Sequence, residues 1–194
     1  MKSVIWIDCE TTGLDPLKQE ITQLAGVVEV DGKVQEEFEL RMRPNHPENA
    51  SAEALAVTKQ TMADIMAHPL SQAEGYRAFV AILAKRCDKY NRSDKYVWGG
   101  QNPRFDIDFV RALFLAHGDK YYGSWFWGTA IDLGGFALAL QIIGLMPPTI
   151  NHKLGTICEA LQVPLDAHKA LDDVRATRTA FYKLVERLRT PAKA

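Results

Sequence analysis

Two carboxylates, Asp8 and Glu10, stand at the end of an apolar, β-branched run that begins at Val4. Such a run is typical of a buried strand, and strand side chains alternate, so Asp8 and Glu10 point to the same face. Neighbouring negative charges repel each other and lose hydration on burial. Carboxylate oxygens suit hard divalent cations such as Mg²⁺ or Mn²⁺. The pair therefore predicts a metal site; the alternative is an exposed turn with two solvated acids.

A third carboxylate, Asp106, lies in a helix expected over residues 103–117. It is in register with Phe109, Val110 and Leu113, which follow at the spacing of one helical face. Because aspartate is seldom buried without a partner, its place in an apolar stripe indicates a function. The alternative is an acidic residue that the positive end of the helix dipole favours.

The fourth candidate is Asp173, on the edge of the apolar face of a final helix expected from about Ala170 to Leu188. His168 precedes it by five residues, which on a continuous helix is a rotation of about 140°. The two side chains can therefore converge only if His168 lies in a loop and Asp173 in the first helical turn. By itself His168 is more typical of a surface histidine or of one with satisfied hydrogen bonds.

These residues form three motifs in order along the chain: Asp8-x-Glu10-Thr11-Thr12-Gly13, Asn102-x-x-Phe105-Asp106 and His168-x-x-x-x-Asp173. Together they resemble the three exonuclease motifs of the DEDDh (DnaQ-like) 3′–5′ exonucleases, a family that includes the epsilon proofreading subunit of bacterial DNA polymerase III. The resemblance runs from Val4 to about Leu188. It implies an α/β, RNase H-like fold, with a five-stranded mixed sheet (an antiparallel meander plus parallel strands) flanked by helices.

The resemblance also implies roles for individual residues. Asp8, Glu10, Asp106 and Asp173 would bind two divalent ions, Mg²⁺ or Mn²⁺, and His168 would be the general base. The substrate contacts would come from Thr11, Thr12, Gly13, Leu14 and Asn102. The expected reaction is phosphodiester hydrolysis at the 3′ end of single-stranded DNA, which releases nucleoside 5′-monophosphates. Two alternatives stay open: an exoribonuclease, and a non-catalytic module that binds nucleic-acid ends or a partner.

The pattern of elements is consistent with this fold. Strand-like runs cover Ile21 to Val30 and Val34 to Leu40, and Asp31-Gly32 between them predicts a hairpin. Ser51, Thr61 and Ser71 or Gln72 are expected to start helices. A short strand at Tyr96–Trp98 and helices over 133–143 and 153–162 follow. We expect one exonuclease domain over residues 1–190 and a short tail over 191–194.

Composition adds the expected setting. A formal net charge of -1 gives no overall basic footprint for nucleic acid. The three cysteines show no C-x-x-C spacing, the chain starts without a signal-peptide pattern, and the longest apolar run, Phe136 to Met146, is too short for a bilayer. We therefore expect a cytoplasmic protein without membrane partners. Because the chain ends soon after the final helix, a stand-alone trimming or repair enzyme is favoured over a polymerase-bound one; its oligomeric state stays open.

An aromatic cluster lies between the second and third motifs. We define it as Tyr121, Tyr122, Trp125, Phe126 and Trp127. Such residues can stack on bases, pack on their own core or form an interface, and packing is the favoured interpretation. Asp132 is expected to cap the following helix, in preference to a role beside the metal site.

Overall fold

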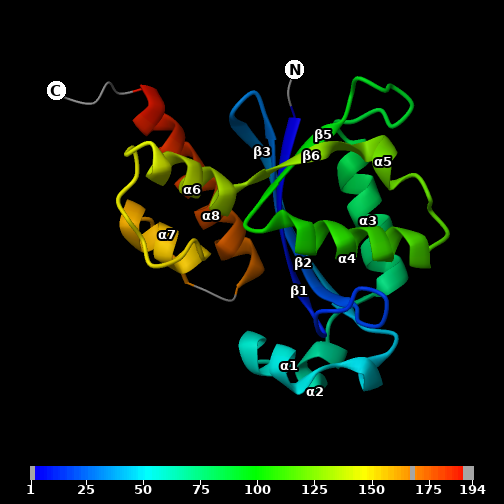
Figure 1. The fold of residues 1–194 in the computed structure, drawn as a ribbon. Helices are drawn as coiled ribbons and strands as arrows, with labels where there is room; N and C mark the ends of the chain where they lie inside the picture. The colour runs from blue at the N-terminus through cyan, green and yellow to red at the C-terminus, as the bar shows by residue number, and fades with distance from the viewer. Residues whose placement is uncertain (1–2, 167–168, 190–194) are drawn as a thin grey trace.

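A central sheet runs through the protein, with helices on both faces (Figure 1). The computed structural model describes residues 3–166 and 169–189. The predicted base His168 and the expected tail at 191–194 lie outside these residues. Among the described residues, no helix is both long and apolar enough to cross a membrane.

The sheet has six strands in the order β4-β3-β2-β1-β5-β6. They are β1 (Ser3–Thr11), β2 (Ile21–Val30), β3 (Lys33–Arg43), β4 (Leu70–Ser71), β5 (Tyr96–Gly100) and β6 (Phe126–Asp132). Strand β1 is antiparallel to β2 and parallel to β5, and β5 is parallel to β6. The expected mixed sheet is confirmed, but the expected count of five strands is wrong. The additional strand, β4, has two residues, too few for an alternating pattern to be visible in the sequence.

The helical elements are a 3₁₀ turn η1 (Pro47–Asn49), α1 (Ala52–Thr58), α2 (Met62–Met66), α3 (Gln72–Ala84), α4 (Pro103–Ala116), α5 (Tyr122–Trp125), α6 (Leu133–Ile142), α7 (Leu154–Leu161) and α8 (Ala170–Arg189). The predicted caps are confirmed. Ser51, Thr61 and Ser71 each accept a hydrogen bond from a backbone amide of the first helical turn, and Asp132 accepts one from the Gly134 amide.

The hairpin between β2 and β3 follows the sequence pattern. Asp31 and Gly32 both adopt positive φ, 49° and 80°, as a two-residue turn that matches the twist of its strands requires. This turn sets the antiparallel register in which Val30 lies opposite Lys33. Strand β2, almost entirely buried, consequently lies in the middle of the sheet beside β1.

The two faces of β1 are covered by different helices. Ile5, Ile7 and Cys9 belong to a core shared with α3 and α4, whereas Trp6 packs with Val174 and Phe181 of α8. The Trp6 and Phe181 rings lie 5.1 Å apart. Because side chains alternate along the strand, Asp8 and Glu10 share the face of Trp6, which is the face that α8 covers.

The aromatic cluster divides into buried and exposed members. Trp125 and Phe126 are each only 3% exposed and, with the partly buried Tyr122, belong to the core beneath α3 and α4. The packing interpretation is therefore confirmed for these three residues. Tyr121 and Trp127 are different: 69% and 45% of their surfaces are exposed.

Candidate active site

Three carboxylates from the two ends of the chain converge at the end of β1. Asp8 and Glu10 come from β1, and Asp173 comes from the first turn of α8. One carboxylate oxygen from each lies within 4.8 Å of those of the others. The convergence follows from local structure, because strand alternation turns Asp8 and Glu10 toward α8 and the helix dipole favours Asp173 in the first turn.

The fourth carboxylate, Asp106, reaches the same place from helix α4. Its Oδ1 accepts a hydrogen bond of 2.8 Å from the backbone N–H of Cys9, the residue between Asp8 and Glu10. Only 3% of Asp106 is exposed. The apolar stripe of Phe109, Val110 and Leu113 is buried as predicted, and it holds the start of α4 against β1.

The electrostatics of the cluster favour a positive partner. Burial, then the charges of Asp106, Glu10 and Asp173, raise the pKa of Asp8 well above its usual range. Burial and the Asp173 charge raise the pKa of Glu10 to about 7. Burial also raises the pKa of Asp106 to about 7, although the Cys9 hydrogen bond opposes this shift. Four acids held this close are therefore unfavourable as anions unless a cation is added.

The donor set fits hard divalent cations. Asp8, Glu10 and Asp173 offer oxygen atoms, which Mg²⁺ and Mn²⁺ prefer over nitrogen or sulfur. The thiol of Cys9, the residue between Asp8 and Glu10, points to the opposite face of β1, where it is buried in the core. The metal-binding roles of the four carboxylates remain predictions. The positions of these side chains are compatible with those roles.

The loop after β1 is tightly cross-linked. Thr12 is fully buried; its Oγ1 accepts a hydrogen bond from the Glu20 amide, and its backbone N–H donates to the Glu20 carbonyl. The Thr11 hydroxyl donates to the Gly13 carbonyl at 2.6 Å. The Thr12 carbonyl also accepts a hydrogen bond from the Ser51 amide. The side chains of both threonines and the backbone polar groups of Thr12 therefore shape the loop, which leaves the residues after Thr12 to meet a ligand.

Gly13 and Leu14 complete this loop. A Cβ on Gly13 would lie 1.9 Å from the amide end of the Gln19 side chain, so any other residue at this position requires Gln19 to move. Leu14 is 82% exposed, and Leu17, three residues further, is 90% exposed. The sequence interpretation included Leu14 but missed Leu17; the available signal was an apolar side chain within an otherwise polar turn.

Asn102, the remaining predicted contact, lies between β5 and α4 in the left-handed region, with φ of 51°. Its backbone N–H donates to Oδ1 of Asp132, the residue that also caps α6. Asp132 therefore joins the ends of β5 and β6 at the edge of the sheet where the carboxylates lie. The side chain of Asn102 makes no hydrogen bond within the described residues and is exposed.

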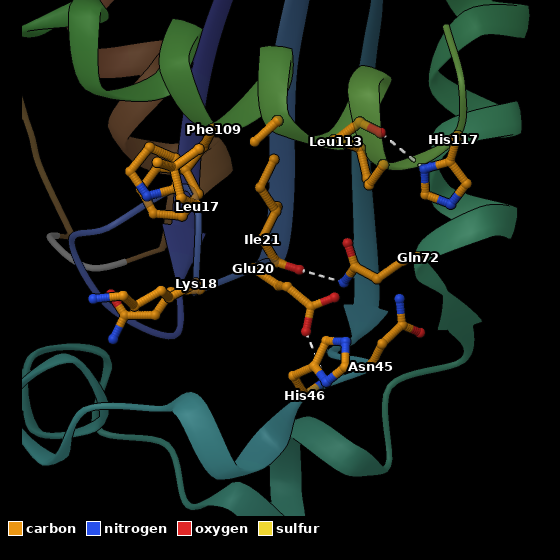
Figure 2. Close-up of a pocket in the computed structure, with 14 residues that line it drawn as sticks. Leu17, Lys18, Glu20, Ile21, Asn45, His46, Gln72, Phe109, Leu113 and His117 are labelled. Atoms are coloured by element: carbon orange, nitrogen blue, oxygen red, sulfur yellow. Dashed lines mark hydrogen bonds between the residues drawn. The ribbon is translucent and has the colours of Figure 1, made fainter.

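A groove of about 300 Å³ lies between the 16–21 loop and helix α4 (Figure 2). Phe109, one turn beyond Asp106, and the exposed Leu17 both line this groove. Polar groups line the rest: Gln72 donates to the Ile21 carbonyl, and the His46 amide donates to Glu20. An apolar wall with a polar rim is suited to a flat, hydrogen-bonding molecule.

Comparison with known proteins places this site in a family. The model of the exonuclease family (RNase_T) matches residues 5–181, which include all four of the carboxylates described above. The chain therefore belongs to the exonuclease family, and the resemblance to the DnaQ-like 3′–5′ exonucleases is confirmed.

The relatives and the similar solved structures are longer than this chain. It is 29% identical over 182 residues to the PolC-type DNA polymerase III of Oceanobacillus iheyensis, covering 93% of this chain and 11% of that one. The zinc-bound Exonuclease I–single-stranded DNA complex of E. coli has a TM-score of 0.81 at 23% identity, covering 98% of this chain and 42% of that one. Exonuclease I of Methylocaldum szegediense has a TM-score of 0.76 at 25% identity, covering 99% and 42%. The chain thus spans about a tenth of the PolC-type relatives and less than half of the Exonuclease I chains.

Proposed function

We propose that this chain, as one exonuclease domain over residues 1–190, removes nucleotides from the 3′ end of single-stranded DNA and releases nucleoside 5′-monophosphates. The observation that carries the proposal is the convergence of Asp8, Glu10 and Asp173 within 4.8 Å, with Asp106 bonded to the backbone between the first two. Membership of the exonuclease family supports the class of reaction.

The four carboxylates would hold two Mg²⁺ or Mn²⁺ ions. Two such ions, when bound, stabilise negative charge on the attacking and leaving oxygens and lower the pKa of bound water. Asp8 and Glu10, on one face of β1, would hold the ions together with Asp106 from α4 and Asp173 from α8. The raised pKa values of Glu10 and Asp106 support this assignment, since binding a cation would favour their ionised forms.

His168 is proposed as the general base, on the strength of the family resemblance. An imidazole with an ordinary pKa near neutrality can accept the proton of the attacking water at physiological pH. The position of Asp173 in the first turn of α8 supports this proposal, because it meets the part of the condition for convergence that concerns Asp173; His168 itself lies outside the described residues.

The exposed loop after β1 would meet the terminal nucleotide. The segment of Thr11, Thr12 and Gly13 would lie against the sugar, and the exposed Leu14 would lie between terminal bases. Asn102 would contact the strand from the other side. The groove of Figure 2 continues from Phe109 along α4 and would receive a base further from the 3′ end.

Single-stranded DNA is favoured as the substrate because the Exonuclease I structure that this fold resembles was determined with single-stranded DNA. The direct test compares oligonucleotides labelled at either end. A 3′ label should appear at once in mononucleotides, whereas a 5′ label should remain in a ladder of shortening strands. Cleavage of circular single strands, which have no ends, would contradict the proposal.

Matched DNA and RNA strands in the same assay test the exoribonuclease alternative, because only the 2′-hydroxyl differs. The proposal expects faster hydrolysis of DNA. Binding without hydrolysis of either strand, with Mg²⁺ and Mn²⁺ each present, would instead support the non-catalytic alternative.

A further inference from the structure

A second surface with the chemistry of a nucleic-acid site lies far from the carboxylates. We name it the basic groove: it has a volume of about 640 Å³ and is lined by Lys89, Tyr90, Arg92, Lys95, Tyr121 and Ser124. Three cations, two aromatic rings and a hydroxyl line it, and no carboxylate does. This segregation is notable in a chain whose formal net charge is -1.

The acidic residues near the basic groove accept hydrogen bonds from neighbouring backbone amides and a hydroxyl. Asp94 accepts a hydrogen bond from the Asp88 amide, and Asp88 accepts one from the Tyr90 amide. Asp119 accepts from the Tyr76 hydroxyl and the Tyr121 amide. These carboxylates therefore fix the backbone around the groove and do not line it.

The cations of the groove, in contrast, lack acidic partners. Lys85 and Arg86, just before it, both pair with Glu36. Within the part of the chain that the structure describes, Lys89, Arg92 and Lys95 form no salt bridge with a carboxylate. The Lys95 ammonium donates to the Gly123 carbonyl at 2.6 Å, which ties the 85–95 loop to α5.

The aromatic side chains at the groove face solvent. Tyr90 is 84% exposed and Tyr121 is 69% exposed. Lys89 Nζ lies 5.4 Å from the Tyr90 ring centroid, and Lys95 Nζ lies 5.6 Å from the centroid of the half-exposed Trp127. Exposed rings interleaved with unpaired cations are the combination that binds single strands, because bases stack on the rings while cations meet the phosphates.

The basic groove lies at the opposite end of the sheet from the carboxylates. Lys95 precedes Tyr96, which pairs with Ser3 at the start of β1, whereas Glu10 lies near the end of that strand. At about 3.3 Å per residue, the two sites are roughly 23 Å apart along β1. Figure 1 shows the 85–95 loop beside α5, away from the end of β1 near α1 and α2.

We infer that the basic groove binds the upstream part of the single-stranded nucleic acid whose 3′ end occupies the carboxylate site. The inference rests on the proposed function for the identity of the strand. It assigns a role to Tyr121 and Trp127, the members of the aromatic cluster that do not pack in the core. A strand held at both sites dissociates more slowly than one held by its end alone.

The test uses the double charge reversal Lys89→Glu and Arg92→Glu, with Lys33→Glu and Arg189→Glu as a control of equal charge. The control residues are exposed and lie in the β2–β3 hairpin and at the end of α8. The measurement is binding of a DNA strand of about 20 nucleotides, which is longer than the roughly 4–16 nucleotides that one compact single-strand site covers. A chelator is present so that the strand is not hydrolysed. The groove variant should bind about tenfold more weakly or worse, with a shallower dependence on salt, and the control variant should not.

Tyr121→Ala separates stacking from charge. This exposed residue can be truncated without loss of core, and affinity for the long strand should fall severalfold with the salt dependence unchanged. Hydrolysis of a strand of about four nucleotides, too short to reach the groove, should be unchanged in all three variants. Equal binding of the long strand by the groove and control variants would overturn the inference and indicate a different ligand, such as an acidic protein. Failure of the unmodified chain to hydrolyse any strand would instead overturn the proposed function.

Discussion

The backbone N–H of Cys9 donates a 2.8 Å hydrogen bond to Asp106, which ties strand β1 to helix α4 at the centre of the candidate site. Through this bond, Asp106 is held beside the strand that carries Asp8 and Glu10. The bond also satisfies an amide in the buried core, so one carboxylate serves both the fold and the site.

Substitutions of Asp106 should separate these two contributions. Asp106→Asn keeps an oxygen that can accept from Cys9 but removes the charge, so it should fold well and lose most hydrolytic activity. Asp106→Ala leaves the Cys9 amide without its acceptor and should be less stable than Asp106→Asn by about 1–3 kcal/mol in chelator. Urea denaturation of both variants measures this difference. Equal stability would show that the Cys9–Asp106 bond does not support the fold.

The stability of the metal-free protein should fall as the pH rises through the carboxylate range. The pKa of Glu10 is raised from 4.5 to about 7 by folding, so the folded state binds more protons between these values. The contribution of Glu10 to the free energy of unfolding is therefore greatest below about pH 4.5. It decreases by roughly 1–3 kcal/mol toward pH 7. The pKa of Asp106, about 7, acts in the same direction.

Thermal unfolding at several pH values in chelator, repeated with excess Mg²⁺ or Mn²⁺, checks this prediction. Added cation should remove most of the decline, because it stabilises the ionised carboxylates. Glu10→Gln should also flatten the profile without cation. The account would be contradicted if, without metal, the unfolding temperature of the unmodified protein rose between pH 4.5 and 7 after correction for surface groups.

Closure of the loop after β1 should depend on Gly13. In Gly13→Ala the new Cβ would meet the Gln19 amide at 1.9 Å. Gln19 cannot turn away freely, since it accepts from the Asp15 amide and donates to the Asn49 carbonyl. Loss of these bonds should cost about 1–3 kcal/mol and lower activity by displacing Leu14. Gly128→Ala is the control, because a Cβ there meets nothing within 4 Å; equal unfolding temperatures for the two variants would refute this role.

Leu14 should matter for substrate and not for stability. The side chain is 82% exposed, so Leu14→Ala should change stability by less than about 0.5 kcal/mol. If the side chain lies between bases, kcat/KM on single-stranded DNA should fall about tenfold from the lost apolar contact. Ile142→Ala, at a residue 76% exposed on α6, supplies the control and should leave kcat/KM unchanged. An unchanged kcat/KM in Leu14→Ala would remove this residue from the substrate contacts.

Much of the fold was predictable because its signals are local. Asp31-Gly32 demands positive φ at both residues and so fixes the β2–β3 hairpin. Ser51, Thr61 and Asp132 cap helices through bonds to amides two or three residues ahead. Such contacts depend only on nearby sequence, and each was predicted correctly.

The rest depends on contacts between distant segments. Strand β4 is defined by the pairing of two residues, Leu70 and Ser71, with the edge of β3. The Cys9–Asp106 hydrogen bond likewise joins residues that are far apart in sequence. The side chain of Thr12 turns inward to Glu20, which residue type alone does not reveal. Asp8, Glu10 and Asp173 lie together as the family resemblance implies, whereas alternation along β1 by itself predicts only that Asp8 and Glu10 share a face. The role of His168 remains a prediction.

The central claim is that the carboxylates at the end of β1 hydrolyse a strand from its 3′ end with the aid of divalent cations. The most direct measurement follows a 5′-labelled single-stranded DNA oligonucleotide with Mg²⁺ or Mn²⁺, using the unmodified protein and Asp8→Asn. Asp8→Asn removes the charge of an acid whose pKa is raised well above its usual range by burial and by the neighbouring carboxylates, and circular dichroism checks the fold of this variant. The account predicts stepwise shortening by the unmodified protein, stopped by chelator, and no shortening by folded Asp8→Asn. Full activity in Asp8→Asn would contradict it.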